Sequence, residues 1–225
     1  MIELRNLTKY YPTERGRKYV FRDLNVTFPG GHSIGVLGRN GAGKSTMLRI
    51  LGGLEAPDAG EVICDESISW PVGLSGGFQG SLSARDNVRF VCRVFGASGQ
   101  EQERIIKYVE DFAEIGDYFD LPVGIYSHGM KSRVTFGTSM AFDFDYYLID
   151  EVMAVGDPIF RKKSSQVFKS KLEGASVILV SHNLKDVAEM CDSALVVERG
   201  SVKVFEDVQE GITYYQEMLK GIPTK

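Results

Sequence analysis

The residues that most clearly indicate chemistry by their types and spacing lie between Gly38 and Ser45, in a segment that reads Gly-Arg-Asn-Gly-Ala-Gly-Lys-Ser. The segment matches the pattern G-x-x-x-x-G-K-[ST] at every fixed position, and a chance match in a chain of this composition has odds of roughly 2%. Glycines let successive backbone N–H groups surround a phosphate, and a helix beginning near Lys44 would direct its positive dipole end at the same anion. Lys44 would contact the β- and γ-phosphates, and the Ser45 hydroxyl would bind Mg²⁺. The segment therefore predicts a nucleotide-phosphate site.

Two adjacent carboxylates, Asp150 and Glu151, follow the apolar run Tyr147–Ile149. Ligands of open α/β sheets bind at the carboxyl ends of strands, which is where this pair would lie. An apolar strand that ends in Asp usually means only that the strand has reached the surface. With a phosphate loop upstream, the pair instead predicts a triphosphatase in which Asp150 holds Mg²⁺ through water and Glu151 polarises the attacking water. The chain lacks the NKxD base-reading motif of GTP-binding proteins, which favours ATP.

Short apolar runs must form the strands that position these groups. Ile34–Leu37 leads directly into the glycine-rich segment, and the pattern turns helical from Lys44. Three later runs are apolar throughout and are separated by helical segments: Tyr146–Ile149, Val177–Val180 and Ala194–Val197. Continuous apolar strands with helices between them predict a parallel sheet that is buried on both faces.

The rest of the chain predicts two additions to this core. Apolar and polar residues alternate over Ile2–Leu7 and in shorter runs up to Phe28, with a polar loop at Glu14–Lys18, which suits an antiparallel β meander. Residues 84–141 carry apolar stripes at helical spacing. We therefore expect one α/β domain over residues 1–225. It would be a P-loop NTPase core with a mainly parallel sheet, an N-terminal antiparallel β subdomain and an inserted helical subdomain at about 84–141.

Composition excludes several classes of protein. The 225 residues are 43% hydrophobic and include 13 Phe and 10 Tyr, which is more apolar surface than a disordered chain carries. No run approaches the ~18 apolar residues that span a bilayer, and Met1–Arg5 does not resemble a signal peptide. The net charge of −4 gives no general attraction to nucleic acid. Cys64, Cys92 and Cys191 form no CxxC pair, so we expect reduced thiols in a cytosolic protein rather than a zinc finger.

These motifs resemble those of the ATP-binding subunits of ABC transporters. Gly38–Ser45 is similar to their Walker A motif and Leu148–Glu151 to their Walker B motif, with Glu151 as the catalytic glutamate. His182, in Val-Ser-His-Asn, is similar to the switch histidine that contacts the γ-phosphate, although a capping or core role is the simple alternative. Ala154–Asp157 is similar to the D-loop, which makes a dimer contact through Asp157. The resemblance implies an ABC-type core with this set of ATP-binding residues in and after the loop: Gly38, Arg39, Asn40, Gly41, Ala42, Gly43, Lys44, Ser45 and Thr46.

Two further positions follow from the resemblance. Tyr11 lies where the family stacks an aromatic ring on adenine, with Tyr10 as a rival, and either tyrosine could be plain packing. Gln79, in Gly-Phe-Gln-Gly, is similar to the Q-loop glutamine that binds Mg²⁺ and responds to the membrane partner. The implied Mg²⁺ ligands are then Ser45, Gln79 and Asp150.

The family's signature motif, a Leu-Ser-Gly-Gly-Gln run that contacts the partner subunit's ATP, has two candidates in this chain. Leu74–Gly77 matches it by letters, whereas Tyr126–Met130 matches poorly but lies just before a helical stripe. A signature serine works at a helix N-terminus, where Ser is a favoured cap. The stripe behind Ser127 consists of Met130, Val134, Gly137 and Ala141. We therefore predict that the working signature is Ser127, His128 and Gly129.

Within the family the chain looks closest to the ATP-binding subunits of bacterial capsular-polysaccharide exporters, which share the Tyr-Ser-x-Gly-Met-Lys signature and the Gly77–Gln79 run. This resemblance implies an ATP- and Mg²⁺-dependent ATPase that works as a nucleotide-sandwich homodimer on a separate polytopic permease. It would lie peripherally on the cytoplasmic face of the inner membrane and power export of an acidic, lipid-linked polysaccharide. Periplasmic and outer-membrane export components would join through the permease, and nucleic acid is not an expected partner.

The sequence leaves several alternative functions open. Related O-antigen and teichoic-acid exporters share part of the pattern, and a non-transport ABC ATPase acting on ribosomes or DNA belongs to another class. A small-molecule P-loop kinase would lack both the signature helix and the Walker B glutamate. The basic run at Arg161–Lys171 is most simply a solvated helix face, although it could also lie near anionic headgroups.

Overall fold

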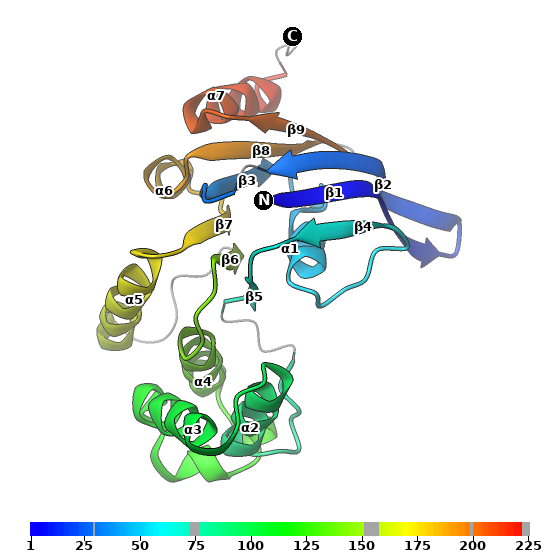
Figure 1. Cartoon of the computed structure of the whole chain (residues 1–225). Helices are drawn as coiled ribbons and strands as arrows, with labels where there is room; N and C mark the ends of the chain where they lie inside the picture. The colour runs from blue at the N-terminus through cyan, green and yellow to red at the C-terminus, as the bar shows by residue number, and fades with distance from the viewer. Residues whose placement is uncertain (29, 73–76, 151–157, 199, 222–225) are drawn as a thin grey trace. The chain divides into compact units, whose positions relative to one another are not determined.

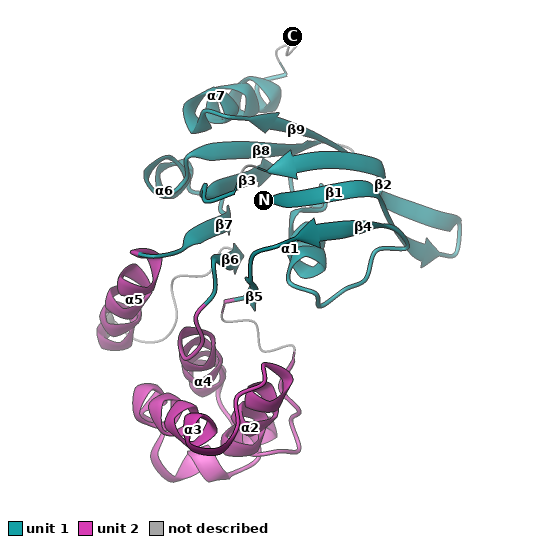
Figure 2. Ribbon diagram, viewed as in Figure 1, with its two compact units in different colours: residues 1–71, 144–151, 174–225 teal, residues 72–143, 152–173 magenta. Residues whose placement is uncertain are grey.

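The computed structural model describes residues 1–28, 30–72, 77–150, 158–198 and 200–221, with the side chain of residue 158 left out. The chain divides into two compact units, which are coloured separately in Figure 2. The first contains Met1–Pro71, Phe144–Glu151 and Gly174–Lys225, and the second contains Val72–Asp143 and Val152–Glu173.

Two sheets form the frame of the first unit (Figure 1). The smaller sheet is antiparallel, in the order β2 (Gly16–Phe28), β1 (Ile2–Thr13) and β4 (Ala59–Cys64). The larger has the order β5 (Ile68–Pro71), β6 (Tyr146–Asp150), β7 (Ser176–Val180), β3 (Ile34–Gly38), β8 (Ser193–Glu198) and β9 (Ser201–Phe205). All its neighbours pair in parallel except β8 and β9, which are antiparallel. The mainly parallel sheet and the antiparallel N-terminal sheet are therefore both confirmed.

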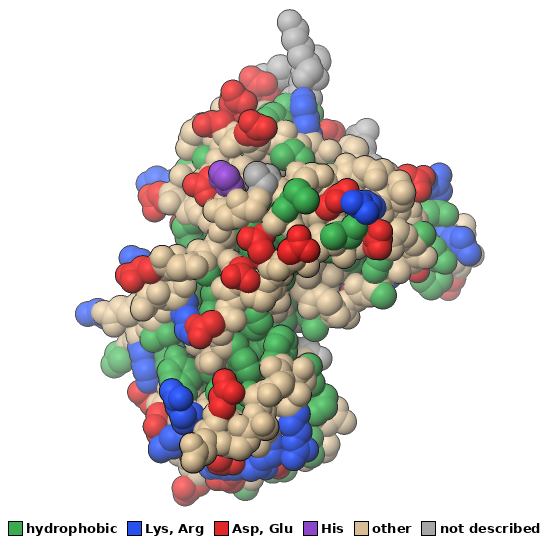
Figure 3. Space-filling view, viewed as in Figure 1, with side chains coloured by type: hydrophobic (Ala, Val, Ile, Leu, Met, Phe, Trp, Pro, Cys, Tyr) green, Lys and Arg blue, Asp and Glu red, His purple; other side chains and the backbone are tan. Residues whose placement is uncertain are grey.

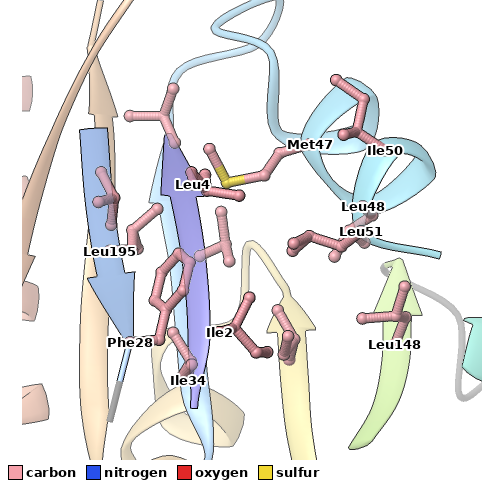
Figure 4. Close-up of a cluster of buried hydrophobic side chains, with 14 of the residues drawn as sticks. Ile2, Leu4, Phe28, Ile34, Met47, Leu48, Ile50, Leu51, Leu148 and Leu195 are labelled. Carbon is pink, nitrogen blue, oxygen red and sulfur yellow. The ribbon is translucent and has the colours of Figure 1, made fainter. Parts of the chain in front are cut away.

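A shared apolar core joins the two sheets of the first unit. The helices of this unit are α1 (Lys44–Leu51), α6 (Leu184–Met190) and α7 (Val208–Leu219). Leu4 of β1, Leu148 of β6 and Leu195 of β8 are all buried in one cluster with residues of α1. Figure 4 shows the Met47 side chain reaching from α1 toward Leu4. The helix that follows the phosphate loop is thus fixed by burial of its apolar face.

The second unit is helical. Its elements are α2 (Ala84–Val94), α3 (Gly99–Ala113), the 3₁₀ turns η2 (Gly116–Asp120) and η3 (Val123–Ile125), α4 (His128–Met140) and α5 (Pro158–Leu172). Phe112 of α3 stacks on Phe136 of α4 with ring centroids 5.8 Å apart, and meets Phe160 of α5 edge-on at 5.3 Å. These aromatic contacts place α5 in the same unit as the expected helical segment 84–141, so the unit extends beyond that segment.

The hairpin between β1 and β2 differs from the expected polar loop at Glu14–Lys18. Residues 16–18 belong to β2, and only Glu14 and Arg15 lie between the paired residues Thr13 and Gly16. Gly16 has φ +108°, which a residue with a side chain rarely adopts. The polar tip pairs as a strand because aromatic and cationic side chains pack across it. Tyr10 lies 5.5 Å from Tyr19, and the Arg17 guanidinium lies 4.4 Å from the Tyr10 ring.

The charges visible on the surface agree with the net charge of −4. On the face shown in Figure 3, acidic side chains predominate over the first unit, with a few basic ones scattered among them. Within the described residues, no helix combines the length and the apolar character that crossing a bilayer requires.

Candidate functional site

The loop between β3 and α1 has the geometry of a phosphate cradle. β3 is buried along its whole length and ends at Gly38, and α1 begins at Lys44 with Gly43 as its N-cap. A Cβ at Gly43 would lie 2.5 Å from Val20 Cγ1, and a Cβ at Gly38 would lie 2.6 Å from the Val197 carbonyl oxygen. Gly43 also has φ +112°. Both positions therefore require glycine. With no side chains at these positions, the backbone N–H groups of the loop are left accessible to a phosphate.

Lys44 lies inside this loop rather than on its outer surface. The residue is 7% exposed, and its Nζ donates hydrogen bonds to the carbonyl oxygens of Gly38 at 2.8 Å and Arg39 at 3.3 Å. A buried ammonium held over the loop supplies the positive charge that the β- and γ-phosphates of a nucleotide require. Glycines, helix N-terminus and lysine thus fit a nucleoside triphosphate.

Asp150 lies at the same edge of the sheet as the phosphate loop. It pairs with Val180 of β7, and Val180 pairs in turn with Val36 of β3, two residues before Gly38. Because parallel strands are about 4.8 Å apart, the Asp150 backbone lies roughly 10 Å from this row of β3, across one intervening strand. A carboxylate is a ligand that Mg²⁺ prefers, so the chemistry of Asp150 at this edge of the sheet fits the cation.

His182 follows β7 at this edge as well. It is exposed and lies in the turn between β7 and α6. Asn183 fixes that turn, because its side chain accepts the Lys185 N–H at 3.1 Å while its own N–H donates to Ser181 Oγ at 3.0 Å. The structure therefore brings the carboxyl ends of β3, β6 and β7 to one edge of the sheet. Asp150 is the last residue of β6, while Lys44 and His182 lie in the segments that follow β3 and β7.

The two candidate adenine residues have different surroundings. The Tyr11 hydroxyl lies 3.4 Å from Thr46 Oγ1 of α1 and donates to Glu55 Oε2 at 3.0 Å. The Tyr10 ring instead packs on Tyr19 and Arg17 along the hairpin. Of the two, Tyr11 is the one connected to the helix that begins at the phosphate loop.

Gln79 belongs to the second unit, where its backbone is held by Asn87. Asn87 is 2% exposed; its Oδ1 accepts the Gln79 N–H at 2.7 Å, and its Nδ2 donates to the Gln79 carbonyl oxygen at 3.1 Å. Asn87 is not among the residues that the sequence motifs indicate. Its only local signal is the capped start of α2, where Ser83 Oγ accepts the Asp86 N–H.

Ser127 caps α4, as the sequence predicts. Its side chain accepts the Met130 N–H at 3.2 Å, and α4 runs from His128 to Met140. His128 is exposed and Gly129 is half-buried at the first turn. Of the rival segment Leu74–Gly77, only Gly77 belongs to the described residues. Glu151 and Asp157 also lie outside them.

Comparison with known proteins identifies the family. The family described as "ABC transporter" matches residues 21–154, which is more than half of the chain. The chain belongs to the ABC transporter family. The chain is one of the ATP-binding subunits of this family, so it binds ATP and is an ATPase.

Relatives of this family match almost the whole chain. The chain is 52% identical to the polysialic acid transport ATP-binding protein KpsT of Escherichia coli, over 96% of each sequence. It is 43% identical to the capsule polysaccharide export ATP-binding protein CtrD of Neisseria meningitidis serogroup B, over 97% of this chain and all of that protein. A solved dimer of the ATP-binding cassette MJ0796, bound to ADP and Pi, is 25% identical with a TM-score of 0.71 and covers 92% of this chain and 99% of its own.

Relatives named for other polymers are less similar. The teichoic acids export ATP-binding protein TagH of Shouchella clausii is 34% identical, and the match covers only 56% of its length. The O-antigen export system ATP-binding protein RfbB of Klebsiella pneumoniae is 31% identical over 84% of its length.

Proposed function

We propose that this chain is the ATP-hydrolysing subunit of an exporter that moves an acidic, lipid-linked polysaccharide across the bacterial inner membrane. The observation that carries the proposal is the 52% identity to a polysialic acid transport ATP-binding protein over 96% of both sequences. The 43% identity to a capsule polysaccharide export protein supports the same substrate class. The lower identities to O-antigen and teichoic-acid relatives make those polymers the second choice.

The first unit supplies one half of the proposed reaction site. The backbone of residues 38–43 and Lys44 bind the phosphates, Thr46 lies beside them, and Ser45 and Asp150 would hold Mg²⁺ directly or through water. Gln79, the third proposed Mg²⁺ ligand, belongs to the second unit. Mg²⁺ supplies charge neutralisation at the β- and γ-phosphates. Glu151 polarises the attacking water as general base, and His182 contacts the γ-phosphate.

The second half comes from another copy of the chain. Ser127 lies at the N-terminus of α4, a position where a hydroxyl and backbone N–H groups bind an anion. In the proposed homodimer Ser127, His128 and Gly129 of one copy meet the γ-phosphate bound by the other, with Asp157 at the dimer contact. The dimeric state of the solved cassette MJ0796 supports this arrangement.

The proposed partner is a polytopic permease, through which periplasmic and outer-membrane export components join. The chain would lie on the cytoplasmic face of the inner membrane, peripherally, with Gln79 responding to the permease. On this view residues 1–225 form one ABC ATP-binding domain, and residues 84–141 are its helical subdomain.

Deleting the gene in its native host tests the substrate assignment. We expect acidic polysaccharide to accumulate inside the cells and to disappear from the surface. A plasmid copy of the parent should restore surface polymer, and a Lys44→Ala copy should not. Unchanged acidic polymer at the surface contradicts the assignment, and loss of O-antigen or teichoic acid instead would favour the alternative exporters.

A further inference from the structure

A network of polar side chains surrounds the Tyr11 hydroxyl. Tyr11 Oη donates to Glu55 Oε2 at 3.0 Å and accepts a hydrogen bond from Arg49 Nη2 at 3.0 Å. Arg49 closes the triangle, because its Nε donates to the same Glu55 oxygen at 3.0 Å. Thr46 Oγ1 lies 3.4 Å from both the tyrosine hydroxyl and Arg49 Nη2. The ring of Tyr11 is thereby tied at its outer edge to helix α1.

The turn that follows α1 explains why Arg49 and Glu55 meet. The helix ends at Leu51, and the chain reverses through Gly53, which has φ +68°. The reversed chain bonds to Arg49 itself, because the N–H groups of Leu54 and Glu55 both donate to the Arg49 carbonyl oxygen, at 2.9 and 3.2 Å. Two residues six positions apart are thus brought together by backbone geometry.

Electrostatics keep both partners of this pair charged. Burial opposes ionisation of Glu55, whose side chain is 19% exposed, but hydrogen bonds from Arg49, Lys9 and Tyr11 outweigh it and lower the pKa of the carboxyl group. The hydrogen bond to Glu55 raises the pKa of the Arg49 guanidinium. Lys9 Nζ holds the other carboxylate oxygen, Oε1, at 3.0 Å. Glu55 is therefore an anion whose two carboxylate oxygens are also held by Lys9 and Arg49.

We infer that Arg49 and Glu55 are positioning residues that hold the Tyr11 ring ready for the base of the bound nucleotide. The inference rests on the proposed function, with Tyr11 as the residue on which the adenine stacks, and it adds a role for two further residues. A ring fixed before binding loses less conformational freedom when the base stacks on it, so affinity is gained without a new contact. Since α1 begins at the phosphate loop, the same anchor sets the distance between base and phosphate sites.

The inference predicts that Glu55→Gln raises the Kd for ATP roughly three- to tenfold, through loss of the charge-assisted contact to Arg49 and freer motion of Tyr11. The full-length chain is titrated with ATP by calorimetry, and steady-state hydrolysis gives KM and kcat. We expect KM to rise by the same factor while kcat stays within about twofold, because the phosphate contacts are intact.

Asp58→Asn is the matched control. Asp58 lies in the same turn region and accepts the Tyr10 N–H at 2.8 Å, so this variant also loses one carboxylate charge but leaves the partners of the Tyr11 hydroxyl in place. Its Kd for ATP should equal that of the parent within twofold.

A double-mutant cycle separates positioning from general destabilisation. In a Tyr11→Ala background, Glu55→Gln should change the Kd for ATP by less than twofold, because the ring on which it acts is gone. An equal rise in Kd in both backgrounds, or no rise in the parent background, overturns the inference. A parent protein that does not bind ATP would instead refute the proposed function, so the two failures are distinguishable.

Discussion

At the residue scale, the phosphate loop depends on missing side chains as much as on Lys44. Gly38 and Gly43 lie against the Val197 carbonyl and the Val20 side chain, respectively, so neither position has room for a Cβ. The ammonium of Lys44 is in turn held by two carbonyl oxygens of the loop. Binding energy at this site therefore comes from groups that are already in place.

Glu151→Gln tests the proposed general base. The amide keeps the shape of the side chain but cannot accept the proton of the attacking water, so hydrolysis should fall by roughly a hundredfold or more. ATP binding should persist, and the variant should accumulate as an ATP-bound dimer in size-exclusion chromatography. Glu206→Gln, at an exposed position after β9, is the control and should hydrolyse ATP at the parental rate. Parental turnover by the Glu151 variant would remove Glu151 from the mechanism.

A functional residue could be predicted from the sequence where a pattern in its neighbouring residues indicates its role. Lys44, Ser45 and Asp150 follow from a fixed spacing or from the end of an apolar run, and the structure places them at one sheet edge. Asn87, which holds the Gln79 backbone, has no such signal, since its partners become neighbours only after α2 has folded. Arg49 and Glu55 were missed for the same reason, because a glycine turn makes them neighbours.

At the element scale, α4 carries the candidate signature at its first turn and is buried along its C-terminal half. Val134 is fully buried, and Gly137 packs so closely on Phe112 that a Cβ there would lie 2.9 Å from the Phe112 ring. The helix start is therefore fixed by the Ser127 cap and its direction by packing on α3.

Ser127→Arg should abolish ATPase activity, because a large cation at the cap position would block closure of the proposed dimer. Binding of ATP to the monomer should stay near normal, which calorimetry measures separately from turnover. Ser75→Ala is the comparison variant and should have little effect on hydrolysis. The opposite pattern, with the Ser75 variant inactive and the Ser127 variant active, would place the dimer interface elsewhere.

Elements with a buried face were predicted well, whereas the pairing at the exposed tip of the β1–β2 hairpin was not. The parallel strands carry continuous apolar runs because both of their faces are covered, so the pattern is visible in the sequence. The tip of the β1–β2 hairpin shows no alternation of apolar and polar residues. It is stabilised instead by ring–ring and cation–ring contacts between the two strands, made by Tyr10, Arg17 and Tyr19. Such cross-strand contacts are set by register, which local composition does not reveal.

At the scale of the whole molecule, the candidate groups are divided between two compact units. The first unit carries Lys44, Asp150 and His182, and the second carries Gln79 and Ser127. In the proposed homodimer each ATP is bound by the first unit of one copy and contacted by the partner subunit's Ser127. A mechanism of this kind couples hydrolysis to association of two copies, which is a way to transmit force to a membrane partner.

The central claim is that the loop at residues 38–45 makes this chain an ATPase. The most direct test is steady-state ATP hydrolysis by the purified full-length chain, alone and with its permease, compared with Lys44→Ala. Removing the buried cation at the β- and γ-phosphates should lower turnover by about a hundredfold or more while circular dichroism shows an intact fold. A parent protein without ATPase activity in both preparations, or a Lys44→Ala variant that hydrolyses ATP at the parental rate, would contradict the account.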